Sequence, residues 1–202
     1  MNKVSVVVPC YNCATTIEKC CISILNQEKI DIELICIDDG STDNTWEVLC
    51  GLKALYPKLI IHKIFNSGVS NARNVGISLS TNEFVGFVDA DDTIHKEMYF
   101  KMSTELIMEN IDLVICNFST SDTLPKLVGE TEYINQNDVL NASLYNSDIQ
   151  GFVWNRLYKK HIIIENDIKF NPNMKAVEDL DFNLNYLQYA NSCTYIQEQL
   201  YN

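Results

Sequence analysis

The chain has 202 residues, of which 47% are hydrophobic and 21% are charged, a composition typical of a globular protein with one substantial core. Its net charge of −12 argues against DNA or RNA as a partner, because nucleic-acid-binding proteins usually present a basic face. A phosphate-bearing ligand remains compatible with this charge if a metal ion mediates the contact.

The eight cysteines raise the question of a disulfide scaffold or a metal site. Cys36 and Cys116 lie inside apolar runs, where a thiol behaves as a small buried hydrophobe. Cys10 and Cys13 have C-x-x-C spacing, but the next two cysteines are adjacent on a predicted helix, which disfavours a zinc site. We therefore expect reduced thiols, as in a reducing cytosol. No secretory signal or membrane-spanning run is visible in the sequence.

The hydrophobic pattern predicts alternating strands and helices over the first 118 residues. Strands are predicted at 4–8, 32–37, 59–65, 84–88 and 113–118. The capping-box pair Thr15 and Glu18 predicts the start of the first helix. A second helix carries Trp46 and ends before Pro57, and two more are predicted over 69–77 and 95–110. This alternation predicts right-handed crossovers and a mainly parallel sheet flanked by helices.

The pattern changes after residue 119. Residues 119–132 are polar and loop-like, 137–145 and 178–189 are predicted helices, and 168–170 is a predicted short strand. We predict a single Rossmann-like α/β domain, in which 1–118 form one half and 119–202 a smaller second half. Because the chain stops within an apolar pattern, we expect it to be truncated at its C-terminus.

Polar residues follow each of the first four predicted strands, at 9–12, 38–39, 66–68 and 89–92. In a parallel sheet these strand ends share one edge, where α/β proteins bind their ligands. Asp89, Asp91 and Asp92 stand within four positions, and their mutual repulsion is relieved most directly by a divalent cation. The alternative is an acidic turn that only caps the next helix.

The glycine-rich phosphate loops are missing: there is no G-x-G-x-x-G after the first strand and no G-x-x-x-x-G-K-[ST]. A dinucleotide oxidoreductase and a P-loop NTPase are therefore disfavoured. A nucleotide can still bind this edge if Tyr11 offers its ring to a base, Asp39 accepts from a base N–H, and Asp89 or Asp91 engages the ribose and a metal. Mg²⁺ or Mn²⁺ held by Asp91 would neutralise the diphosphate.

Six segments together resemble glycosyltransferase family 2, the inverting nucleotide-sugar transferases of GT-A fold. These segments are residues 6–12, 38–43, 68–74, 89–92, 154–158 and 178–182, and they occur in the expected order over nearly the whole chain. A single D-x-D motif is a weak signal, but six segments in register are specific. The resemblance implies the GT-A fold, with residues 1–118 as its nucleotide-binding half and 119–202 as its acceptor-side half, and a hexosyltransferase type of activity.

The resemblance also implies how the nucleotide would be held. Pro9, Tyr11 and Asn12 resemble the wall of the nucleoside pocket. Asp39 resembles the carboxylate that recognises the base. Arg73 resembles the residue that contacts the nucleotide from the helix after the third strand.

The remaining implied roles concern metal and acceptor. Asp89 and Asp91 match the D-x-D pair, with Asp89 on the nucleotide and Asp91 as the direct metal ligand. Asp179 matches the catalytic base, which takes a proton from the acceptor hydroxyl in a single inverting displacement. Trp154 and Glu178 belong to the acceptor side. The cofactor expected from the family is Mn²⁺ or Mg²⁺.

The family further implies a biological setting. The expected donor is a UDP-sugar, and the expected acceptor is a saccharide or lipid-linked intermediate of polysaccharide or glycoconjugate synthesis. We expect a cytoplasmic protein, with peripheral association at the inner membrane face as an option that the family raises. The sugar, linkage and oligomeric state stay undetermined at this stage.

Simpler explanations stand beside these roles. Acids such as Glu178 and Asp179 are favoured at a helix N-terminus by the helix dipole alone, Asp43 reads as a helix cap, and Trp154 fits a core position as well as an acceptor platform. At the level of function, the alternatives are a nucleotide-sugar binding module without turnover and a nucleotidyltransferase. The latter is disfavoured because its glycine-rich basic loop is absent.

Overall fold

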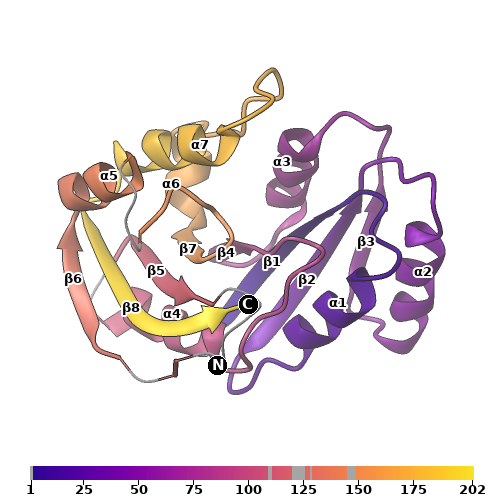
Figure 1. Ribbon diagram of the computed structural model, residues 1–202, viewed down its shortest axis with the longest axis horizontal. Coiled ribbons are helices and arrows are strands. Elements are labelled where there is room, and N and C mark those ends of the chain that lie inside the picture. Colours follow the sequence, from indigo (N-terminus) through magenta and orange to yellow (C-terminus); the bar gives the residue numbers. More distant parts are fainter. Residues whose placement is uncertain (1, 109–110, 120–125, 128, 145–148) are drawn as a thin grey trace.

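An eight-stranded mixed sheet forms the centre of the protein, in the order β3-β2-β1-β4-β7-β5-β8-β6 (Figure 1). The computed structural model describes residues 2–108, 111–119, 126–127, 129–144 and 149–202. The strands are β1 (Lys3–Cys10), β2 (Asp31–Asp38), β3 (Ile60–Lys63), β4 (Phe84–Phe87), β5 (Leu113–Phe118), β6 (Thr131–Asn135), β7 (Arg156–Lys159) and β8 (Ser192–Tyr201). The helices are α1 (Ile17–Leu25), α2 (Thr45–Leu55), α3 (Val69–Leu79), α4 (Met98–Met108), α5 (Gln136–Leu144), α6 (Lys160–Glu165) and α7 (Glu178–Leu187).

The first four strands are mutually parallel, as predicted. Val7 at the centre of β1 lies opposite Ile35 of β2 on one side and Phe87 of β4 on the other, and β3 extends the sheet beyond β2. The carboxyl ends of all four strands therefore share one edge of the sheet. This confirms the expectation on which the predicted ligand site depends.

The two faces of the sheet bury separate cores. Val4, Val6 and Val8 face a core with α1, α2 and α4, whereas Val7 faces a core with α3, α5, α6 and α7. Side chains alternate along a strand, so the continuous apolar run of β1 is what a strand covered on both faces requires. Figure 1 shows the corresponding helix layers on either side of the sheet.

The second half departs from the simple alternation. β7 runs antiparallel between β4 and β5, β5 pairs in parallel with β8, and the edge strand β6 is antiparallel to β8. Neither β6 nor β8 is predicted from the sequence. The side chains of β6 are largely exposed, so it carries little hydrophobic signal.

Two local predictions are wrong. Residues 168–170 are not a strand, because the side-chain amide of Asn74 takes the place of a pairing strand: its Nδ2 donates to the Phe170 carbonyl (2.8 Å) and its Oδ1 accepts from the Phe170 N–H (2.9 Å). The predicted capping box does not form, since α1 begins at Ile17 after Thr16, and Thr16 Oγ1 donates to the Cys13 carbonyl. The predicted helix ends at 110 and 145, and part of the predicted loop 119–132, lie outside the described residues.

Six of the eight cysteines are buried, as predicted for small apolar core side chains. Among the helices that the structure describes, none combines the length and hydrophobicity that a membrane span needs.

Residues 69–79 form helix α3 although Gly68 precedes it and Gly76 lies within it, and each of these glycines has a structural role. Gly68 caps α3 with φ of 92°, a backbone conformation that glycine adopts at low cost. Gly76 lets α3 approach β1, because an added Cβ would overlap Val7 Cγ1 and lie 2.9 Å from Val7 Cγ2. The close packing of α3 on β1 thus requires glycine at 76.

We predict that Gly76→Ala lowers the free energy of unfolding by about 1–3 kcal/mol, because Val7 and the helix must move apart. The matched control is Gly51→Ala in α2, where an added Cβ meets nothing within 4 Å, so that helix propensity alone should stabilise by about 0.5–1 kcal/mol. Urea denaturation measures both. Equal effects of the two substitutions would contradict the proposed contact.

Candidate active site

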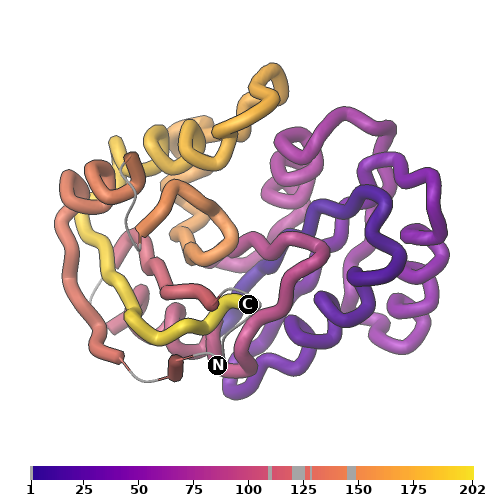
Figure 2. Tube along the Cα trace, in the orientation of Figure 1, coloured from indigo at the N-terminus to yellow at the C-terminus, as the bar shows by residue number. Residues whose placement is uncertain are grey.

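Segments distant in the sequence meet where β4 ends. The loop after β4 is held against the C-terminal end of the chain by two backbone hydrogen bonds, from Thr93 N to Asn202 O and from Asn202 N to Thr93 O, both 2.9 Å. Figure 2 shows these two segments side by side. The acidic turn that follows β4 is therefore fixed by a part of the chain more than a hundred residues away.

A buried guanidinium joins three carboxylates from two further elements. Arg73 of α3 is 3% exposed. Its Nη1 donates to Asp179 Oδ1 (2.5 Å) and Glu178 Oε1 (3.5 Å), and its Nη2 donates to Asp89 Oδ1 (3.1 Å). The guanidinium lies 5.2 Å from the centre of the Phe170 ring. The structure thus brings the predicted residues Arg73, Asp89, Glu178 and Asp179 into one cluster.

The cluster carries one positive charge against three negative ones. Burial raises the pKa of Asp179 to about 6, although Arg73 acts in the opposite direction. Burial likewise raises the pKa of Asp89, again against Arg73. Asp179 Oδ2, the oxygen that Arg73 does not engage, accepts from the Val153 N–H at 3.3 Å. A carboxylate that exchanges its proton near neutral pH is suited to act as a general base.

The turn after β4 presents oxygen ligands. Asp91 is exposed and makes no hydrogen bond or ion pair within the described part of the chain. Tyr201 Oη donates to Asp92 Oδ2 (2.8 Å) and accepts from the Asp89 N–H (3.1 Å). Burial raises the pKa of Asp92 to about 6, and the charges of Asp89 and Asp91 add to the rise. The turn is therefore short of positive charge.

The residues present fit a divalent cation bound together with a substrate. Among the described residues, no group of three or more His, Cys, Asp or Glu side chains forms a complete metal cage. Mg²⁺ is commonly bound by only one or two carboxylates plus substrate phosphates. Asp91 and the Asp89 oxygen that Arg73 does not engage are donors of this kind.

A cavity of about 220 Å³ opens at the ends of β1 and β2. Its lining comprises Pro9, Cys10, Tyr11, Asp39, Asn66, Gly68, Val69 and Ala72. Asp39 is buried and holds the loop before α3, accepting from Ser67 N through Oδ1 and from Gly68 N through Oδ2, both at 2.8 Å. The predicted residues Pro9, Tyr11 and Asp39 thus share one cavity.

Asn12 has a different position from its predicted neighbours. It is absent from the lining of that cavity. Its φ is 50°, and its Oδ1 accepts from the backbone N–H groups of Thr42 (2.8 Å) and Asp43 (3.3 Å). The side chain therefore organises the loop that connects β2 to α2. Asp43 Oδ1 accepts from the N–H of Thr45, the first residue of α2. The N-cap position itself is Asn44, whose side chain makes no capping hydrogen bond, so Asp43, the predicted cap, supports the start of α2 from one residue before the N-cap.

A second cavity, of about 370 Å³, is bounded by two acids of the cluster. Glu178 and Asp179 line it together with Ser143, Gln150, Gly151, Phe152, Val177 and Leu180. Val177, which precedes the two acids, has φ of 59°, a strained conformation for a β-branched residue. Strain of this kind is concentrated at functional sites, and here it sets the direction in which α7 begins.

Aromatic rings connect this cavity to the acidic turn. Trp154 stacks on Phe152 (ring centres 4.7 Å apart) and on Tyr201 (4.3 Å), and Phe118 contacts it edge-on. Phe152 and Tyr201 are site residues that the sequence argument missed. Tyr201 in particular reaches the site through the pairing of β8 with the distant strand β5, and such long-range pairing has no local signature in the sequence.

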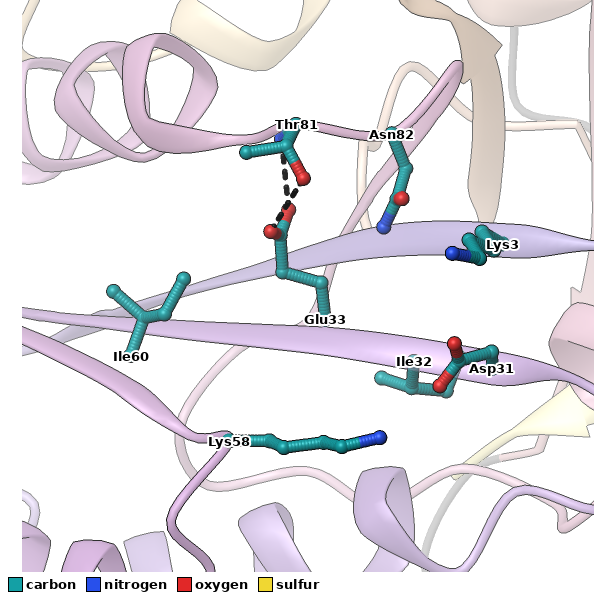
Figure 3. A pocket seen from close by; sticks show the side chains of 8 residues that line it. All are labelled: Lys3, Asp31, Ile32, Glu33, Lys58, Ile60, Thr81 and Asn82. Atoms are coloured by element: carbon teal, nitrogen blue, oxygen red, sulfur yellow. Dashed lines mark hydrogen bonds between the residues drawn. The ribbon is translucent and has the colours of Figure 1, made fainter.

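A third cavity, of about 280 Å³, lies near the amino ends of β1 and β2, away from this edge (Figure 3). Its central carboxylate, Glu33, accepts from Ser5 Oγ (2.5 Å), Thr81 Oγ1 (2.7 Å) and Thr81 N (2.8 Å). These bonds tie β2 to the segment after α3. Because the carboxylate is already satisfied, we regard this cavity as structural.

The sheet order and the residues at its edge define the GT-A fold of nucleotide-sugar transferases. The family model for glycosyl transferase family 2 matches residues 5–166, and the chain belongs to this family. The predicted fold and family are confirmed.

Relatives and solved structures agree with this family. The uncharacterized glycosyltransferase YibD of Escherichia coli K12 is 30% identical over 209 residues, covering 99% of this chain and 60% of YibD. The poly(ribitol-phosphate) beta-N-acetylglucosaminyltransferase TarP of Staphylococcus aureus is 32% identical over 195 residues, covering 93% and 58%. The crystal structure of S. aureus TarS 1–349 in complex with UDP matches with a TM-score of 0.82 and 26% identity, covering 98% of this chain and 59% of that one. The chain thus spans about 60% of the length of these relatives.

We predict that Arg73→Met lowers the free energy of unfolding by about 3–5 kcal/mol, because it leaves buried carboxylates without their counter-ion. The control is Lys29→Met, which removes an ion pair to Glu97 made by a lysine that is 57% exposed and should leave stability nearly unchanged. Both are measured by urea denaturation at neutral pH. An Arg73→Met variant as stable as the control would refute the role assigned to the guanidinium.

Proposed function

We propose that this chain catalyses the inverting transfer of a sugar from a nucleotide-sugar, with a UDP-sugar as donor, to an acceptor hydroxyl. The observation that carries the proposal is the position of Asp179. It is a carboxylate with a pKa raised to about 6 that shares the guanidinium of Arg73 with Asp89 and lines a cavity of its own. A carboxylate suited to act as a base is therefore joined to the acidic turn through one guanidinium, and Ala72, the neighbour of Arg73 on α3, lines the cavity at the ends of β1 and β2.

The donor would occupy the cavity at the ends of β1 and β2. Tyr11, which is 50% exposed, offers a ring face to the base, with Pro9 beside it. Asp39 retains acceptor capacity for a base N–H, because each carboxylate oxygen can accept two hydrogen bonds. Asn12 would act through the loop that it holds. The UDP complex of TarS, which is 26% identical over nearly the whole chain, supports uridine as the nucleoside.

Mn²⁺ or Mg²⁺ would be held by Asp91, with Asp89 beside it. When bound, such a cation supplies positive charge to the leaving diphosphate. The unrelieved repulsion among Asp89, Asp91 and Asp92 supports its binding here. Tyr201 keeps the turn in shape through its two hydrogen bonds.

The chemical step requires one base. The acceptor hydroxyl gives its proton to Asp179 Oδ2, and the oxygen attacks the anomeric carbon on the face opposite the departing nucleoside diphosphate. The new glycosidic bond forms as the bond to the diphosphate breaks, which inverts the anomeric centre. Arg73 holds Asp179 and Asp89 at a fixed separation. The base would therefore be held in a fixed position relative to the anomeric carbon of the bound donor.

The acceptor would lie in the cavity beside Phe152. Phe152 lines this cavity and offers apolar ring surface of the kind on which the C–H faces of a sugar pack. Trp154 is stacked between Phe152 and Tyr201, so it would act on the acceptor side by supporting the Phe152 ring. Glu178 lines the same cavity as Asp179. A saccharide or lipid-linked acceptor in polysaccharide or glycoconjugate synthesis fits this cavity. The names of TarP and of chondroitin synthase from Pasteurella multocida support that setting. We place the reaction in the cytoplasm, at or near the inner membrane face, as part of the same proposal.

We predict that Asp179→Asn lowers the rate of transfer by about 100- to 10,000-fold, because the amide cannot accept the proton, while UDP binding survives. The matched control is Asp181→Asn, which neutralises an acid in the same turn of α7 and should retain activity. In the unmodified chain, kcat/KM should fall as the pH drops below about 6, since the base must be deprotonated and its pKa is about 6.

Asp92 is the other acid whose pKa is raised to about 6, and Asp92→Asn distinguishes it from the base. In this variant kcat/KM should still fall as the pH drops below about 6, because Asp179 is unchanged. Binding of UDP without turnover in the unmodified chain, against a broad set of acceptors, would instead identify a nucleotide-sugar binding module.

We also predict that UDP with Mn²⁺ raises the melting temperature more than ADP with Mn²⁺ does, since a ligand that binds the native state at 100 times its Kd stabilises by about 2.7 kcal/mol. Asp91→Asn should abolish the part of the shift that depends on Mn²⁺ and leave the remainder. Equal shifts with UDP and ADP would contradict the donor assignment, and an unchanged Mn²⁺ effect in the variant would contradict the metal assignment.

A further inference from the structure

Arg156 of β7 is a buried cation that has no carboxylate partner within the described part of the chain. Its side chain is fully buried, and its Nε and Nη1 make no hydrogen bond there. The two other buried cations of the described residues both pair with acids, Arg73 with three carboxylates and Lys159 with Asp112 at 3.0 Å. A buried charge without a partner destabilises a fold, so arginine at this position calls for a reason other than stability.

The hydrogen bonds that Arg156 does make end at the wall of the cavity that Asp179 lines. Its Nη2 donates to Ser143 Oγ (3.0 Å) and to the carbonyl oxygen of Gln150 (2.6 Å). Both acceptor residues line this cavity together with Asp179. Ser143 belongs to α5, which packs beside α7, the helix that carries Asp179 (Figure 1). The guanidinium therefore lies behind two residues of the cavity wall.

The Ser143 hydroxyl has a proton to donate. Within the described part of the chain its oxygen accepts from Arg156, but its proton goes to no acceptor. In other helices, hydroxyls donate to a carbonyl three or four residues earlier, as those of Ser23, Ser78, Ser103 and Thr104 do. A hydroxyl that accepts from a cation becomes a stronger donor. The proton of Ser143 is therefore available to a ligand in the cavity.

We propose that Ser143 binds the acceptor in this cavity and that Arg156 is the positioning residue that orients and polarises its hydroxyl. Ser143 would donate to a second oxygen of the acceptor, while the reacting hydroxyl donates to Asp179 Oδ2. An acceptor held at two oxygens has a fixed orientation. The cavity would therefore select a sugar or polyol over an alcohol with one hydroxyl. This inference rests on the proposed function, which supplies the acceptor.

A positioning role and a structural role of Arg156 predict different effects of Arg156→Met. If the guanidinium served the fold, its loss would lower the melting temperature, as expected for Arg73→Met. The positioning role predicts a melting temperature at or above that of the unmodified chain, because removing an unpaired buried charge removes its desolvation cost. The KM for the acceptor should nevertheless rise, since Ser143 loses the donor that orients its hydroxyl.

The experiment compares transfer with hydrolysis of the donor. UDP release from UDP-glucose, UDP-galactose and UDP-N-acetylglucosamine is measured alone and with the methyl glycosides of the same three sugars. Ser143→Ala should raise the KM for the glycoside by about 3- to 10-fold, as loss of one hydrogen bond does, and leave hydrolysis and UDP affinity unchanged. Ser143→Thr keeps the hydroxyl and should restore the KM. The control Ser78→Ala removes an exposed helical hydroxyl and should change nothing.

A second measurement needs no turnover. Binding of the same methyl glycosides, with UDP and Mg²⁺ present, is followed by saturation-transfer NMR, and Ser143→Ala and Arg156→Met should each weaken it. Their double variant should be no weaker than either, because both act through one hydroxyl. Unchanged KM and glycoside binding in Ser143→Ala would refute the role of Ser143, and a much lower melting temperature of Arg156→Met would refute the positioning role. Glycoside binding that depends on Ser143 without any turnover would refute the proposed function alone.

Discussion

The arrangement of this molecule depends on one buried guanidinium. Arg73 of α3 donates to Asp89 after β4 and to Glu178 and Asp179 at the start of α7, which joins the first half of the chain to the second. Arginine suits this position better than lysine, because its planar group offers several donors in fixed directions and remains charged when buried. The Phe170 ring beneath it adds a cation–π contact.

The same contact explains the chemistry of the cleft. A single cation cannot neutralise three carboxylates, so burial prevails and the pKa of Asp179 is raised to about 6. The remaining negative charge extends to the turn with Asp91 and Asp92. A site with surplus carboxylates cannot bind a diphosphate directly, but it can do so through a divalent cation. The net charge of −12 is therefore compatible with a phosphate-bearing substrate.

Much of the first half was predictable, because its information is local. The strands β1, β2 and β4 contain short apolar runs followed by polar residues. Because parallel strands place their ends together, the position of Tyr11, Asp39 and Asp89 at one edge of the sheet follows from their spacing. The antiparallel insertion of β7 and the pairing of β8 depend on contacts between distant segments. Hence Tyr201 and Phe152 could not be predicted as site residues from local patterns. Residues 168–170 have the apolar pattern of a strand, but the Asn74 side chain binds the backbone of Phe170 in place of a neighbouring strand.

The central claim is that nucleotide, cation and base share one cleft built around Arg73. Anomalous diffraction from crystals grown with UDP and Mn²⁺ tests it most directly, because the ion is located independently of any assumed role. The account predicts a manganese peak between Asp91 and the diphosphate, with uracil beside Tyr11 and Asp179 facing the same cleft. Manganese or UDP bound instead at the Glu33 cavity or at another separate surface would contradict the account.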